Sequence, residues 1–196
     1  VTLNTFFFYT FTGPRKSARQ EMGYCHNGLT FASNLMIKSM TKSERITSIA
    51  LATILLLTII NSTWYFLGMA RVSIIQWLVF NACAPSGIAF LLGLFICFRT
   101  SNRMWLCTAF TPMMFFGTMG LFVFPWKSGI DLLTQFSHVI MTANIAWGLW
   151  IILKNKDYKA MGTGLLTSTL VFIPFIAFTQ SYCREHAEEV MKYLGL

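Results

Sequence analysis

Four side chains that can form hydrogen bonds or exchange protons follow one face of a predicted helix. Asp131, Gln135, His138 and Thr142 are spaced four, three and four residues apart. At 100° per residue, these positions stay within about 40° of one line along a helix. A neutral imidazole in such a row can act as a general base, a metal ligand or a structural hydrogen-bond partner. The spacing therefore indicates His138 as the centre of any chemistry here, with Gln135 placed one turn before it to orient the ring.

Polar residues of two other predicted helices reach the same depth. Thr58, Asn61, Ser62 and Tyr65 form a second row, and Asn81 lies at a similar level in the next apolar stretch. Together they predict a small polar cavity that opens toward the outer face and is closed below by apolar side chains. The alternative is that these groups only hold the helices together, through interhelical hydrogen bonds worth about 0.6 kcal/mol each. The residues predicted to line the cavity are Asn61, Ser62, Asn81, Gln135, His138 and Thr142.

A catalytic use of the same residues requires a nucleophile beside the histidine. Ser62 or Thr58 would then be the nucleophile of an intramembrane hydrolase for lipid-like substrates, with His138 as the general base. The chain contains no nucleotide-binding loop, HExxH helix, GxSxG elbow or carboxylate pair. We therefore place ligand binding ahead of an enzymatic function.

The sequence predicts no metal site and no cofactor. His26 and His186 lie outside the apolar stretches, so the second histidine that would face His138 across a haem is missing. Methionine and cysteine are soft ligands that suit copper, but 11 methionines in a lipid-facing protein are ordinary packing material. Cys83, Cys97 and Cys107 lie within the apolar stretches, and we interpret them as small buried hydrophobic residues. The five cysteines of the chain include no CxxC pair.

The helices that must position these residues are long and apolar. Five stretches without Asp, Glu, Lys or Arg reach the length of about 20 residues that a helix needs to cross a bilayer. They cover residues 46–69, 74–98, 104–124, 132–153 and 160–179. Continuous apolar runs favour helices over strands, and only 11% of the chain is charged. The sequence thus predicts an all-α, polytopic integral membrane bundle of five transmembrane helices.

The distribution of Lys and Arg predicts the orientation of this bundle. With a cytoplasmic N-terminus, 11 of the 15 Lys and Arg residues fall on the cytoplasmic side. Such an excess is typical of cytoplasmic loops, so we expect an N-in, C-out protein of the plasma (cytoplasmic) membrane. Anionic lipid headgroups account for the net charge of +8, and we expect no nucleic-acid partner.

The connections between the stretches are short, which favours one up-and-down bundle without a soluble domain. Residues 1–45 are predicted to form a basic cytoplasmic segment, 46–180 the bundle, and 181–196 a short polar helix on the outer surface. Pro85, Pro112 and Pro174 lie inside the second, third and fifth stretches. Each removes a backbone hydrogen bond and is expected to bend its helix.

Three functions fit these features. The first is binding or translocation of a small neutral or amphipathic, lipid-like molecule in the polar cavity. Ion-coupled pumping is disfavoured, because no charged residue lies within the stretches. The second function is the hydrolase described above. The third is a structural subunit of a larger membrane complex or oligomer, and membrane lipids are expected partners in every case.

Overall fold

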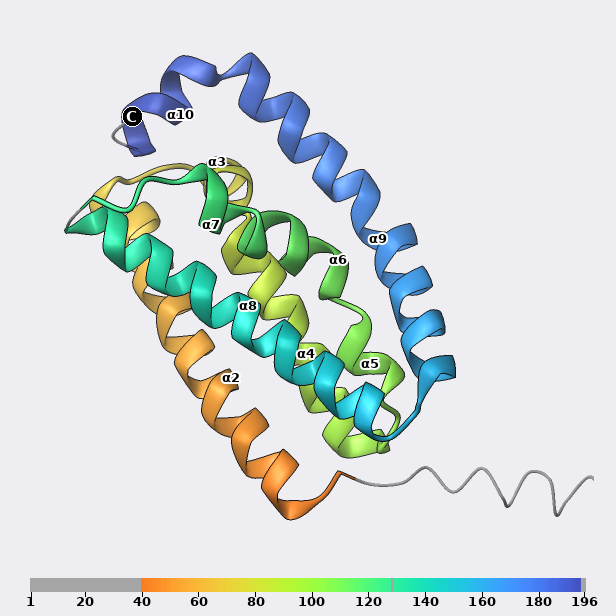
Figure 1. The fold of residues 1–196 in the computed structure, drawn as a ribbon. Coiled ribbons are helices and arrows are strands. Elements are labelled where there is room, and N and C mark those ends of the chain that lie inside the picture. Colours follow the sequence, from red (N-terminus) through yellow and green to blue (C-terminus); the bar gives the residue numbers. More distant parts are fainter. Residues whose placement is uncertain (1–39, 128, 195–196) are drawn as a thin grey trace, which may run out of the picture. The chain divides into compact units, whose positions relative to one another are not determined.

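The computed structural model describes residues 40–127 and 129–194, and these are helical without a strand (Figure 1). The chain divides into the units Val1–Ile37 and Lys38–Leu196. All the helices named here belong to the second unit. The predicted basic segment 1–45 lies outside the described residues, apart from residues 40–45. In chain order the elements are α2 (Lys42–Thr63), the π-helix η1 (Trp64–Met69), α3 (Ile74–Phe80), α4 (Cys83–Thr100), α5 (Met104–Cys107), α6 (Phe110–Pro112), the π-helix η2 (Met113–Thr118), α7 (Gly120–Val123), α8 (Ile130–Lys154), α9 (Tyr158–Glu185) and α10 (Ala187–Leu194).

Five helical segments are long and apolar enough to span a membrane, as the sequence predicted. They are Lys42–Met69, Cys83–Thr100, Met104–Val123, Asp131–Lys154 and Tyr158–Glu185. The last segment differs from its predicted end at residue 179, because α9 runs on without a helix breaker to Glu185. The polar C-terminal helix, expected over 181–196, is α10 and follows His186.

α2 begins one turn before its apolar stretch because Thr41 caps it. The Thr41 hydroxyl accepts from the Glu44 amide, and the Glu44 carboxylate accepts from the Thr41 amide at 2.9 Å. This capping box satisfies two amides that a helix start leaves without partners. The other Glu44 oxygen accepts from Lys154 at the end of α8, at 3.1 Å. Glu44 therefore stabilises the start of α2 and also joins α2 to α8.

The second predicted span is broken into α3 and α4 at Asn81, where a continuous bent helix was expected. Pro85 explains the position of the break, since a proline ring clashes with the carbonyl four residues before it, which is that of Asn81. The Asn81 backbone leaves the helical region, with φ −115° and ψ 43°, and its carbonyl accepts from the Ala84 amide instead. The break makes Cys83 the first residue of α4.

The third predicted span is broken in the same way. Pro112 excludes the carbonyl of Thr108, and the helix is interrupted at Thr108 and Ala109, between α5 and α6. The Thr111 amide, near the start of α6, donates to the Ser168 hydroxyl of α9 at 3.1 Å. Pro174, in contrast, does not interrupt α9, which stays continuous but curves (Figure 1).

Glycines allow α5 to lie backbone to backbone against two neighbours. A Cβ at Gly93 of α4 would come within 2.4 Å of the Trp105 carbonyl, and one at Gly164 of α9 within 2.5 Å of the Met104 carbonyl. Both contacts are with backbone atoms, which cannot swing aside as a side chain can. The two glycines therefore set the distances of α4 and α9 from α5.

α2 and α9 lie on opposite sides of the group formed by α4 to α8 (Figure 1). In the most apolar part of each span, only 17% of the residues of Lys42–Met69 and 11% of those of Tyr158–Glu185 are buried, against 44% for Asp131–Lys154. The exposed side chains on these two helices include Leu57, Ile60, Leu166 and Leu170. Lipid tails or another apolar surface must therefore cover α2 and α9 in the native setting.

Candidate functional site

Two of the predicted site residues, Gln135 and His138, are fully buried on one face of α8. Gln135 is 0% exposed and His138 is 2% exposed. Both contact the last turns of the third span, α7 and the residue after it, Phe124. We use the name His138 site for His138 and the residues that surround it, Cys83, Gly120 and Phe124, together with Gln135, which bonds to Gly120 and Phe124.

The Gln135 amide holds α7 in place. Its Nε2 donates to the Phe124 carbonyl at 2.6 Å and to the Gly120 carbonyl at 3.5 Å. These bonds identify the nitrogen end of the amide, because a carbonyl only accepts. The opposite atom, Oε1, is buried and has no hydrogen-bond partner among the described residues.

The His138 ring is enclosed by the same segment. It stacks on Phe124 with ring centroids 5.3 Å apart and an interplanar angle of 20°. A Cβ at Gly120 would lie 2.6 Å from Cε1 of the ring, so only glycine lets α7 approach this closely. Nδ1 of His138, like Oε1 of Gln135, is buried and has no hydrogen-bond partner among the described residues.

The remaining ring nitrogen contacts a cysteine that the sequence analysis had assigned to packing. His138 Nε2 lies 3.4 Å from Cys83 Sγ, which also donates to the Phe116 carbonyl of η2 at 3.4 Å. The signal for this contact was Pro85, because the break that it causes places Cys83 at the start of α4. The contact could be recognised only from the fold, which brings the start of α4 close to His138 of α8; residue spacing alone does not give this.

The other predicted residues are satisfied by nearby groups. The Thr142 hydroxyl donates to the His138 carbonyl at 2.9 Å, and its oxygen lies 3.2 Å from that of the Thr118 hydroxyl. Asn81 donates to the Ser62 hydroxyl at 3.2 Å, which in turn donates to the carbonyl of Ile59. Thr58 donates to the carbonyl of Leu55. The hydroxyls of Ser62 and Thr58, both predicted as nucleophiles, thus donate to carbonyls of α2. The possible nucleophile that His138 does contact is the Cys83 thiol.

Asn61 is exposed, and the hydrogen bond between Asn81 and Ser62 is separate from the contacts of Gln135 and His138. α2 turns Ile59 and Ser62 toward the bundle, and at 100° per residue Asn61 then falls on a different face. The expected open cavity is also replaced by close packing of α7 and Phe124 on His138. Two hollows of the described residues lie elsewhere, one lined by Ser48, Phe90, Leu94, Leu106, Asn144, Trp147 and Gly148, the other by Met40, Arg45, Cys97, Phe98 and Ser101.

Cys83 and His138 are both ligands that soft metals accept. A structural zinc site uses four protein ligands and a catalytic one three. Among the residues that the structure describes, no group of three His, Cys, Asp or Glu is close enough to hold a metal ion. The chemistry open to the pair is therefore that of a thiol beside an imidazole.

Comparisons of the chain with protein-family models, with curated proteins and with solved structures give no match. The function must therefore be inferred from the His138 site and from the helices that carry it.

Proposed function

We propose that this chain is a multi-pass membrane protein that binds, or carries across the membrane, a small neutral or amphipathic lipid-like molecule at the His138 site. One observation carries the proposal: Oε1 of Gln135 and Nδ1 of His138, one turn apart on α8, are both buried and have no hydrogen-bond partner in the part of the chain that the structure describes. A buried polar atom without a hydrogen bond costs about 1–3 kcal/mol. A ligand that supplies the missing bonds would recover this energy.

The chemistry of the two atoms limits the ligand. Oε1 of Gln135 can only accept a hydrogen bond. Nδ1 of His138 accepts or donates according to the tautomer, which the Cys83 contact at Nε2 influences. A hydroxyl group donates one bond and accepts others, so it satisfies both atoms. A charged ligand would have to leave its water shell without a charged partner in the site, which is costly. We therefore infer a neutral alcohol-type headgroup attached to an apolar tail.

Access to this site requires movement of α7. This element has only four residues, and its neighbours are the π-helix η2 and the loop that begins at Phe124. π-helical turns occur often at functional sites. The two Gln135 bonds to Gly120 and Phe124 hold the cover shut, and a ligand hydroxyl would compete for the same amide.

Ligand binding is tested by thermal unfolding in phospholipid nanodiscs with oleyl alcohol and with its methyl ether, which cannot donate. At 100 times its Kd, the alcohol is expected to stabilise the fold by about 2.7 kcal/mol, whereas the ether gives a much smaller shift. Gln135→Met and His138→Ala should each weaken the affinity for the alcohol about ten-fold, in line with one lost hydrogen bond, so the stabilisation at the same alcohol concentration falls to about 1.4 kcal/mol. Ser137→Ala is the matched control, because its hydroxyl donates to the Leu133 carbonyl of its own helix. Equal shifts for alcohol and ether in the wild-type protein would contradict the proposal.

The proposed orientation is N-in, C-out in the plasma membrane. In support of it, one end of the unit carries Lys42, Arg45, Arg99, Arg103, Lys154, Lys156 and Lys159, whereas the described residues of the other end carry Arg71, Lys127, Arg184 and Lys192. The richer end is expected to face the cytoplasm.

Labelling of single introduced cysteines in intact cells tests this orientation. Lys127 and Lys156 are both exposed in connections between helices, one at each end of the unit. Lys127→Cys should react with a membrane-impermeant maleimide in intact cells, and Lys156→Cys only after permeabilisation. Labelling of the native cysteines is measured in the protein without an introduced cysteine and is subtracted as background. The reverse pattern of labelling would show the opposite orientation.

A further inference from the structure

We propose that Cys83 and His138 form a nucleophilic pair that accepts an acyl group from a fatty acyl thioester within the membrane. The inference concerns the site of the proposed function and rests on that site being reached by molecules with an apolar tail. It adds a covalent step that reversible ligand binding does not require.

The first support is the contact itself. Sγ of Cys83 and Nε2 of His138 are 3.4 Å apart. A neutral imidazole at this position can take the thiol proton, and the thiolate is the nucleophilic form of cysteine. Nδ1 is the nitrogen left without a partner among the described residues, so Nε2 is the atom that faces the thiol and can exchange a proton with it.

The second support is the position of Cys83 in its helix. It is the first residue of α4, a helix of 18 residues. The start of a helix carries a partial positive charge of about 0.5, which favours a thiolate over a thiol. This position exists because Pro85 breaks the second span at Asn81. In an unbroken helix over 74–98, the same cysteine would lie in the helix interior and would lack this field.

The third support comes from the surroundings. α4 and α8 are both segments apolar enough to span a membrane, and the pair lies between them, covered by η2 and α7. A substrate that reaches this place must have an apolar chain. Thioester exchange suits such a place because it consumes no water and no oxidant. Water exclusion also protects the acylated cysteine from hydrolysis.

The step balances as a simple transfer. His138 Nε2 takes the Cys83 proton, and Sγ attacks the carbonyl carbon of the thioester. The bond from that carbon to the sulfur of the leaving group breaks, and the imidazolium returns its proton to the leaving thiolate. The products are an S-acylated Cys83 and a free thiol, and His138 is again neutral.

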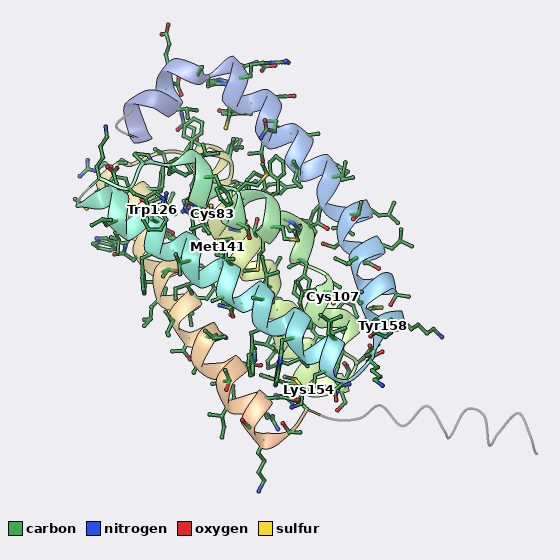
Figure 2. The ribbon with its side chains drawn as sticks, in the orientation of Figure 1. Cys83, Cys107, Trp126, Met141, Lys154 and Tyr158 are labelled. Carbon is green, nitrogen blue, oxygen red and sulfur yellow. The ribbon has the colours of Figure 1, made fainter. Side chains whose placement is uncertain are left out.

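Other cysteines of the same chain provide the control. Cys97 and Cys107 are also buried and free, but no contact with a histidine occurs at either one among the described residues. Cys107 lies on α5 at a different level of the bundle from Cys83 (Figure 2). If burial in an apolar environment were sufficient for acylation, the three residues would react at similar rates.

The test uses the full chain in nanodiscs with an alkyne-tagged palmitoyl-coenzyme A, and measures hydroxylamine-sensitive adducts on each cysteine peptide by mass spectrometry. We expect Cys83 to be acylated at least ten times faster than Cys97 and Cys107. His138→Gln should slow Cys83 about a hundred-fold, the usual scale of a lost general base, and Cys83→Ser should remove the adduct. The wild-type comparison needs no variant, so a folding defect in either variant leaves it valid. Equal rates at the three cysteines would overturn the inference.

The two proposals fail in different ways. A wild-type protein that oleyl alcohol stabilises, but whose Cys83 is not acylated faster than Cys97, keeps the proposed function and loses the covalent step. Selective acylation of Cys83 without any stabilisation by oleyl alcohol keeps the nucleophilic pair and removes the binding function.

Discussion

Gly164→Ala is expected to destabilise the protein by about 2 kcal/mol, the typical cost of overpacking a tight contact. The new methyl group would lie 2.5 Å from the Met104 carbonyl oxygen and 2.6 Å from Cys107 Cβ. Neither atom is the mobile end of a side chain, so α9 would have to move away from α5. That movement would also lengthen the bond between the Thr111 amide and the Ser168 hydroxyl.

Gly162, two residues away on the same helix, provides the matched control. A Cβ at this position has no atom within 4 Å. Gly162→Ala should therefore stabilise the helix by up to about 1 kcal/mol, through helix propensity alone. Unfolding by sodium dodecyl sulfate in mixed micelles measures both variants under one condition. Similar stabilities for the two variants would contradict the described packing of α9 on α5.

Glu44→Leu is expected to cost about 2–4 kcal/mol, because it removes two hydrogen bonds to a charged group and leaves the Thr41 amide without its partner. The Glu44 residue is only 2% exposed, although it is charged. Glu44→Gln keeps an acceptor for the Thr41 amide and loses only the ionic part of the Lys154 contact. Since the Lys154 side chain is 48% exposed, the loss in this variant should be at most about 1 kcal/mol.

A double-mutant cycle isolates the ion pair. Glu44→Gln and Lys154→Gln, alone and together, are compared by the same unfolding measurement. The Lys154 ammonium also lies 4.5 Å from the centre of the Trp150 ring, a contact that the cycle subtracts. A coupling energy of zero would mean that α2 and α8 are joined at this end by the capping box and apolar packing alone.

The five membrane-length helices were predictable because apolar runs of about 20 residues have few other uses. The interruptions were not predicted as such. Pro85, Pro112 and Pro174 were treated alike, yet only the first two break their helices. The carbonyl freed by Pro85 accepts from Ala84, and the orphan amide after the second break donates to Ser168 on α9. Partners of this kind depend on packing and local geometry, which the spacing of prolines does not show.

The site was predictable in part for a related reason. The spacing of Gln135 and His138 predicts that they share one face of α8, and both are buried there; their role in binding stays a prediction. Asn61 is exposed on α2, and polarity alone does not reveal which face of an apolar helix is turned inward. Cys83 was missed because a cysteine is apolar enough to pass for packing material. Its contact with His138 arises from the Asn81 break.

The hydrogen bond from Thr111 to Ser168 also bears on how the chain is made. The two residues are 57 positions apart, and a ribosome adding about 5–20 residues per second needs about 3–11 s to cover that distance. During this time the amide near the start of α6 has no α9 to receive its hydrogen bond. The third apolar segment therefore completes its backbone hydrogen bonds only after the fifth segment has been synthesised. The order of synthesis thus leaves the middle of the bundle to be completed last.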